Sequence, residues 1–222
     1  PKGRATVMRE WLRQLANKNF ALEINKHSSF FKKLFLTRKS DFSNEVYQAM
    51  AGCLGCKACA NQCPLSVDVP EFKAKFLAIY FQRYLRPLRD YFIAYVEMIS
   101  SWQAKWPRIN NWFISNPIFQ FILRKGLRMV DPPLLSEVSL RKELLKRNAP
   151  MLKDRVTAQT DNSLILIQDS LTSFFDSTVL LDTYDLLTKL GYTVFVAPFF
   201  PSGKPLHVKG FLNKFNQVQI EC

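Results

Sequence analysis

The chain has 222 residues, of which 48% are hydrophobic and 22% are charged, so it can form one large or two small globular domains. No apolar run approaches the roughly 18 residues of a membrane-spanning helix, and no secretion signal is visible. An integral membrane protein and a secreted disulfide scaffold are therefore not expected, and we predict a cytoplasmic protein.

The formal net charge is +13, and residues 1–40 hold ten Lys or Arg against two acidic residues. A solvated helical face, phosphate neutralisation on nucleic acid, and a surface that faces acidic lipids or an acidic neighbouring domain are all compatible with this excess. No helix-turn-helix, zinc-finger or RNP pattern accompanies the charge, so we expect no nucleic-acid partner.

Apolar residues recur at helical spacing over residues 4–17 and again over residues 20–36, which predicts two helices. Ser43 is a candidate N-cap for a third, short helix. That helix leads into a loop that is rich in cysteine.

Cys53, Cys56, Cys59 and Cys63 lie within eleven residues, and Pro64 follows them. The spacing C-x2-C-x2-C-x3-C-P is typical of a bacterial ferredoxin motif whose thiolates hold a [4Fe–4S] cluster. A structural zinc site is the alternative, but its ligands usually come in two pairs that are separated by a dozen or more residues. We therefore predict an iron–sulfur ligand set.

In proteins with two clusters, the fourth cysteine of this motif crosses to the second cluster. Cys53, Cys56 and Cys59 would then need a fourth ligand, and Cys63 would need three more. The only other cysteine is Cys222, and a leftover cysteine is usually a small hydrophobic residue rather than a ligand. The missing ligands, together with the absent initiator methionine, lead us to expect a fragment of a longer polypeptide.

After the loop, Asp68, Pro70 and Glu71 have the pattern of a capped helix start. The expected buried face of that helix contains Phe72, Phe76, Ile79 and Tyr80. A helix on each side of the cysteine loop is the order found in a helical ferredoxin.

Pro87 divides the next helical stretch, which runs to Pro107. The tryptophans of this region are Trp102, Trp106 and Trp112. Their near-helical spacing predicts core residues, and a belt on a membrane surface is the alternative. A break at residues 131–133 precedes a predicted helix over residues 136–153.

The composition then changes to an α/β pattern. Residues 163–168 form a continuous apolar run typical of a buried parallel strand, residues 177–190 have helical period, and residues 192–197 predict a second strand. No G-x-G-x-x-G follows the first strand, so no dinucleotide site is predicted. The predicted fold is a mainly α, helical-ferredoxin-like [4Fe–4S] domain over residues 1–155, followed by an incomplete Rossmann-like βαβ domain over residues 160–222.

Several segments are similar to one known family. They are Pro1–Ala5, Met8–Leu12, the cysteine run with Val69–Phe72, Arg83–Asp90, Asp169–Asp176 and Pro201–Phe211. Together they resemble the carboxy-terminal iron–sulfur region of FAD-linked oxidases, the FAD-binding and iron–sulfur-binding dehydrogenases of D-2-hydroxyglutarate or D-lactate. The resemblance covers nearly the whole chain.

This resemblance implies the electron-transfer portion of an enzyme that oxidises a D-2-hydroxy acid. Electrons would pass from FAD, in an upstream domain of the same polypeptide, through [4Fe–4S] clusters to a quinone or another carrier. Cys53, Cys56 and Cys59 would bind one cluster and Cys63 the other. The flavin and substrate sites would lie outside this chain, so no catalytic or flavin-binding residue is assigned here. Peripheral contact with the inner face of the membrane fits such an acceptor.

The last segment is similar to a cysteine-rich domain but lacks its cysteines. For its loop around Gly203, Lys204 and His207, anion binding or docking of another domain is the alternative, and a surface or capping role is expected for His207. For the whole chain, the alternative function is a basic, non-enzymatic cysteine–metal module that binds nucleic acid or a membrane surface.

Overall fold

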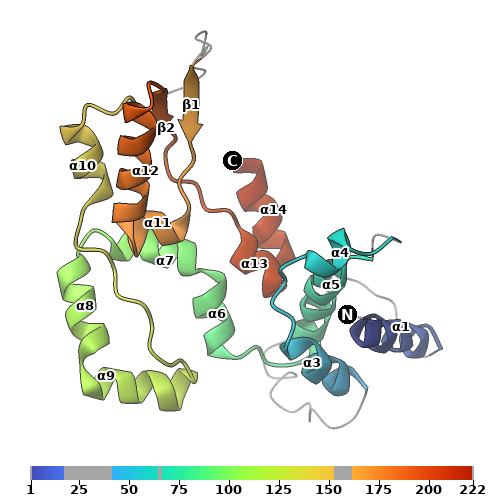
Figure 1. Ribbon diagram of the computed structural model, residues 1–222. Helices are drawn as coiled ribbons and strands as arrows, with labels where there is room; N and C mark the ends of the chain where they lie inside the picture. The colour runs from blue at the N-terminus through green and yellow to red at the C-terminus, as the bar shows by residue number, and fades with distance from the viewer. Residues whose placement is uncertain (1, 18–41, 65–66, 153–161, 222) are drawn as a thin grey trace. The chain divides into compact units, whose positions relative to one another are not determined.

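The computed structural model describes residues 2–17, 42–64, 67–152 and 162–221 (Figure 1). The predicted helix over residues 20–36 and Cys222 lie outside these ranges. The chain forms two compact units, residues 1–94 with 203–221 and residues 95–202. No helix in the described part of the chain is long and apolar enough to cross a bilayer.

The first unit is helical and contains the four cysteines. Its helices are α1 (Lys2–Asn17), α3 (Ser43–Ala51), α4 (Ala58–Asn61), α5 (Val69–Arg83), α6 (Leu88–Ala94), α13 (Lys204–Val208) and α14 (Leu212–Glu221). Helices α1, α3 and α5 contact one another, and α13 packs against α5 and α6. A helix therefore lies on each side of the cysteine loop, as the sequence predicts.

Aromatic side chains fill the core of this unit around α5. Trp11 of α1 lies edge-on to Phe76, with 4.9 Å between the ring centroids, and Tyr80 stacks on Tyr47 at the same distance. The indole Nε1 of Trp11 donates a hydrogen bond of 3.0 Å to Ser43 Oγ. The prediction of Ser43 as a cap is wrong, because its hydroxyl is buried against Trp11 and the cap position belongs to Phe42.

The start of α5 confirms the predicted cap, since Asp68 Oδ1 accepts a hydrogen bond of 3.0 Å from the backbone N–H of Glu71. Phe76 and Tyr80 are buried as predicted, but Phe72 is 40% exposed. Lys73 is buried instead. Its ammonium group has a backbone acceptor in the cysteine loop, which compensates for the loss of hydration.

The segment around Gly210 fixes α13 onto α5 and α6. The guanidinium of Arg86 donates to the carbonyls of Lys209 and Gly210 and lies 3.8 Å from the ring centroid of Phe211. The Lys209 ammonium contacts the buried carboxylate of Asp90 at 2.7 Å. Gly210 has φ +72°, and a Cβ there would lie 2.7 Å from the Cβ of Leu77, so only glycine fits.

The second unit contains a parallel two-stranded sheet with helices. Its elements are α7 (Val96–Gln103), α8 (Pro107–Ser115), α9 (Pro117–Ile122), the π-helix η1 (Leu123–Leu127), α10 (Leu140–Lys146), β1 (Ser163–Leu166), α11 (Ser170–Phe174), α12 (Ser177–Lys189) and β2 (Thr193–Val196). The register pairs Ser163 with Thr193 and Leu166 with Val196. The predicted βαβ order is confirmed.

A core between α10, α12 and β2 holds the second unit together. It contains Leu140, Leu144, Ala149, Leu180, Leu181, Tyr184, Val194 and Val196. The predicted helix over residues 136–153 is wrong at both ends, because α10 spans only Leu140–Lys146 and Met151 forms a parallel bridge with Val196. The expectation of a buried first strand is also wrong, since Ile165 is 52% exposed.

The two compact units differ in extent from the predicted domains over residues 1–155 and 160–222. Helix α7 packs against α11, and α10 packs against α12, so residues 95–152 belong with the βαβ unit. Residues 203–221 pack with the cysteine-bearing helices. The helical-ferredoxin and Rossmann assignments remain predictions.

We predict that Gly210→Ala destabilises the first unit by about 2–3 kcal/mol, because the new methyl group meets α5 backbone and cannot move away. Urea unfolding followed by circular dichroism measures this loss. Gly126→Ala is the control, because a Cβ there meets nothing within 4 Å and should change stability by less than about 0.5 kcal/mol. Equal effects of the two substitutions would contradict the prediction.

Candidate metal centre

The four predicted cysteines lie on one loop between α3 and α5. Two left-handed residues shape this loop, Gly55 with φ +72° and Lys57 with φ +60°. Cys56 is exposed, Cys53, Cys59 and Cys63 are half-buried, and all four are free thiols. The loop therefore presents four free thiols near the surface of the first unit.

The backbone of this loop has unused hydrogen-bond donors. The N–H groups of residues 54–59 donate to no acceptor in the described part of the chain, whereas Cys53 and Cys63 donate to the carbonyls of Met50 and Ala60. Backbone N–H groups that point towards cluster sulfurs are a principal means of tuning an iron–sulfur centre. Six consecutive open donors between the cysteines suit that role.

Charged side chains of α5 and of its N-cap hold the start and the middle of the loop. Lys73 Nζ donates to the carbonyl oxygen of Cys53. Lys57 Nζ lies 3.3 Å from Asp68 Oδ2, and the other oxygen of that carboxylate caps α5. Burial lowers the pKa of Lys73, while the nearby Cys53 opposes this shift. The spacing of the cysteines does not predict these contacts. The sequence signal for them was Lys73, a lysine on an otherwise apolar face of its helix.

Helix α13 covers the loop from the other side. A Cβ on Gly55 would lie 2.9 Å from Val208, so the loop backbone packs closely against α13. His207 Nε2 lies 2.7 Å from Glu71 Oε2, and its side chain is only 13% exposed. The expected surface position of His207 is therefore wrong: the ring ties α13 to α5.

The Glu71–His207 contact affects the pKa of Glu71. Burial raises the pKa of Glu71, but hydrogen bonds from His207 and Lys75 together outweigh burial and hold that pKa below its ordinary value. The ionised carboxylate is therefore the form that the folded unit favours. The loop around Gly203 and Lys204 contributes to this packing, since a Cβ on Gly203 would meet the ring of Phe215 at 3.0 Å.

The donor set fits an iron–sulfur cluster by its chemistry, since four soft thiolates on one loop are accompanied by open N–H donors. Within the described ranges, no three His, Cys, Asp or Glu side chains converge on a position suited to a single metal ion. Cys222 lies outside these ranges. The structure thus places Cys53, Cys56, Cys59 and Cys63 on one loop without a preformed mononuclear site.

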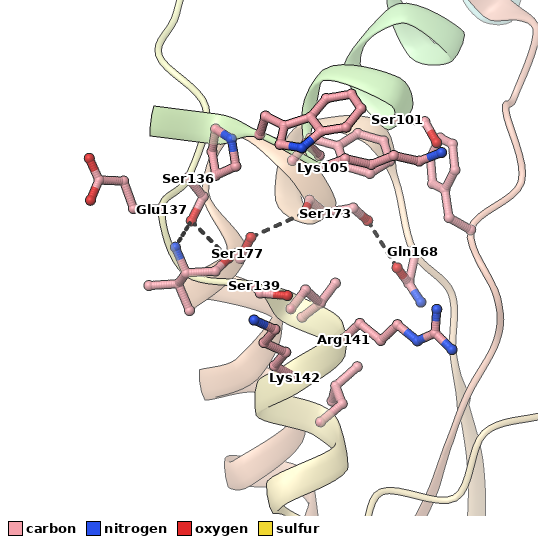
Figure 2. Close-up of a pocket in the computed structure, with 18 of the residues that line it drawn as sticks. Ser101, Lys105, Ser136, Glu137, Ser139, Arg141, Lys142, Gln168, Ser173 and Ser177 are labelled. Atoms are coloured by element: carbon pink, nitrogen blue, oxygen red, sulfur yellow. Dashed lines mark hydrogen bonds between the residues drawn. The ribbon is translucent and has the colours of Figure 1, made fainter. Parts of the chain in front are cut away.

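The second unit has a pocket of about 980 Å³ whose lining includes Gln168 and Ser173 (Figure 2). These polar groups have partners, since Gln168 Nε2 donates to the Ala197 carbonyl, and Ser173 Oγ donates to Gln168 Oε1. The cationic side chains of the lining are Lys105, Arg108, Arg141 and Lys142. The lining contains no cysteine, and we assign no reaction to this pocket.

Comparison with known proteins finds relatives that all carry one name. The chain is 42% identical over 234 residues to D-2-hydroxyglutarate dehydrogenase of Escherichia coli K12. It is 40% identical over 237 residues to the enzyme of that name from Pseudomonas putida, and 39% identical over 235 residues to that from Haemophilus influenzae. These alignments cover 97–99% of the chain.

The chain spans about a quarter of the length of these relatives, 23–24% in each case. No family model matches the sequence, and no solved structure matches it. The relatives support the family that the sequence resembles, and their name is that of an oxidoreductase. That name is not informative about clusters or flavin.

We predict that Glu71→Gln weakens the attachment of α13 by about 1 kcal/mol at pH 7, after allowance for solvent screening. Because the folded pKa is lowered, the stabilisation is present above the ordinary value of 4.5 and is lost as pH falls through the folded pKa. The difference between the variant and the parent should therefore shrink as pH falls below 4.5. Hydrogen-exchange protection of residues 203–211, corrected for intrinsic rates, measures the difference.

The matched control is Glu143→Gln, which removes a half-buried carboxylate that pairs with Lys146 and Arg147 in the second unit. It should leave protection of residues 203–211 unchanged over the same pH range. A Glu71→Gln effect that does not shrink as pH falls below 4.5 would show that charge is not the cause.

Proposed function

We propose that this chain is the iron–sulfur electron-transfer portion of a flavin-dependent enzyme that oxidises a D-2-hydroxy acid. The observation that carries the proposal is the cysteine loop, with four reduced thiols at ferredoxin spacing and open N–H donors between them. The names of the relatives support hydroxy-acid oxidation, and they favour it over a basic, non-enzymatic cysteine–metal module that binds nucleic acid or a membrane surface.

In this proposal, a bound [4Fe–4S] cluster supplies a one-electron relay between flavin and acceptor. Cys53, Cys56 and Cys59 hold one cluster, and Cys63 is a ligand of the second. The remaining ligands, the FAD and the hydroxy-acid site belong to parts of the longer protein outside these residues. The electron acceptor is a quinone or another carrier.

In this proposal, other residues of the chain hold the cysteine loop in position and place positive charge near it. Lys73 holds the Cys53 carbonyl, and the Lys57–Asp68 pair holds the middle of the loop against α5. Val208 packs on Gly55 and limits access of water to that side of the loop. Exclusion of water and nearby positive charge both affect the reduction potential of such a centre.

The test is the full-length protein, purified without oxygen. It should contain iron and acid-labile sulfide, and Cys59→Ser or Cys63→Ser should each lose about four iron atoms per chain. Cys222→Ser is the control and should keep the full content. A colourless protein that contains stoichiometric zinc and no iron would overturn the proposal.

A second measurement separates electron transfer from hydroxy-acid oxidation. D-2-hydroxyglutarate should bleach the flavin absorbance and produce an electron paramagnetic resonance signal from reduced clusters. In Cys59→Ser and Cys63→Ser, the flavin should still bleach while the cluster signal falls. A full cluster signal in both variants would exclude these cysteines as ligands.

A further inference from the structure

Residues 102–130 of the second unit form a feature that the proposed function does not use, and we name it the aromatic arm. It contains α8, α9 and η1, and Figure 1 shows α8 and α9 meeting at a sharp corner. No residue between positions 101 and 134 is buried. Three helical elements in succession therefore contribute no side chain to a core.

The exposed side chains of the arm are unusually apolar. They are Trp102, Trp106, Ile109, Trp112, Phe113, Ile118, Phe121, Ile122 and Val130. Trp112 is 64% exposed, Phe121 is 62% exposed, and Ile118 is 73% exposed. The prediction that the tryptophans are core residues is wrong for Trp102, Trp106 and Trp112 alike. Exposed apolar side chains that gather on one segment mark an interaction surface.

The apolar residues follow the helix period and form one stripe on each helix. On α8 the stripe is Ile109, Trp112 and Phe113, and on α9 it is Ile118, Phe121 and Ile122. Both sets have the spacing i, i+3, i+4, which places their side chains on one helix face. Phe113 and Phe119 bring the two helices together, with 6.4 Å between their ring centroids.

The arm has a fixed backbone rather than a loose one. Asn111 exchanges two hydrogen bonds with the backbone of the buried residue Leu135, of 2.8 and 2.9 Å. Asn116 Oδ1 accepts from Ile118 N–H at 2.9 Å and caps α9. The exposed stripes are therefore held in place by polar contacts on the other side of the helices.

Charge indicates what covers the arm. Residues 98–130 contain no Asp or Glu, and they contain five basic residues. These are Lys105, Arg108, Arg124, Lys125 and Arg128. Arg108 and Arg124 pair with Glu137 and Asp131, whereas the other three have no acidic partner in the described part of the chain. An apolar stripe with tryptophan and flanking cations matches the interface of a bilayer that contains anionic lipids.

We infer that the aromatic arm is a peripheral membrane anchor that inserts the stripes of α8 and α9 among anionic lipid headgroups. The aromatic rings enter the boundary between headgroup and acyl chain, where an amphipathic ring is favoured. The unpaired cations bind lipid phosphates. The inference goes beyond the proposed function, and its test requires no cluster.

The test uses the full-length protein and sedimentation with two kinds of vesicle, phosphatidylcholine alone and phosphatidylcholine with phosphatidylglycerol. Binding should require the anionic lipid and weaken as salt concentration rises. Trp112→Ser with Ile118→Ser and Phe121→Ser should weaken binding at least about tenfold. The matched control replaces exposed apolar residues of α12, as Val179→Ser with Leu186→Ser and Leu190→Ser, and should bind like the parent.

Charge is tested in the same assay. Lys105→Gln with Lys125→Gln and Arg128→Gln should also weaken binding at least about tenfold. Arg141→Gln with Lys142→Gln and Lys189→Gln removes the same charge outside the arm and should not. Equal loss in both triple variants would mean that net charge, not the arm, binds the lipid, and it would overturn the inference.

Hydrogen exchange of residues 107–127 distinguishes the membrane from other partners. These residues should become more protected when anionic vesicles are added than they are in the full-length protein alone. No gain in protection on addition of anionic vesicles would mean that another part of the protein or a second copy already covers the arm. That result, or a lack of binding to either vesicle, would overturn the inference.

Discussion

The cysteine-bearing unit depends on the attachment of α13 to α5. The cysteine loop makes few internal hydrogen bonds between residues 54 and 59, so its own backbone does not define its path. Lys73 holds one end from α5, and Val208 packs on the middle from α13. Glu71 with His207 joins α5 to α13, and Asp90 of α6 with Lys209 holds the end of α13. The shape of the loop is thus set by residues that are distant from it in sequence.

This arrangement connects the fold to the proposed chemistry. A cluster loop must leave its N–H groups unpaired within the protein, because those groups are needed for sulfur. Unpaired donors would ordinarily destabilise a buried loop. Here the loop is near the surface, and neighbouring helices supply the rigidity that internal hydrogen bonds would otherwise provide. Preorganisation without backbone self-pairing is the property that the proposed electron-transfer function requires.

Sequence patterns predicted the features that depend on neighbouring residues. The cap at Asp68, the position of α1 and the order of β1, α12 and β2 follow from local spacing. Patterns failed where residues that are distant in sequence determine the environment of a side chain. Ser43 meets Trp11, and Lys73 finds a carbonyl acceptor 20 positions away, so neither environment is visible from local sequence. The prediction that the tryptophans are core residues is wrong because the helical period identifies the apolar face of a helix but not what covers that face.

The exposed edge of β1 has a consequence for work on isolated pieces of this protein. Among the described residues, β1 pairs only with β2, while β2 also pairs with Met151 on its other side. This edge of the sheet therefore presents open backbone groups beside the exposed side chains of Ile165 and Ile167. An open sheet edge pairs readily with strands of other chains. Shortened versions of the protein that begin or end near β1 will self-associate during expression unless a charged or proline substitution blocks this edge.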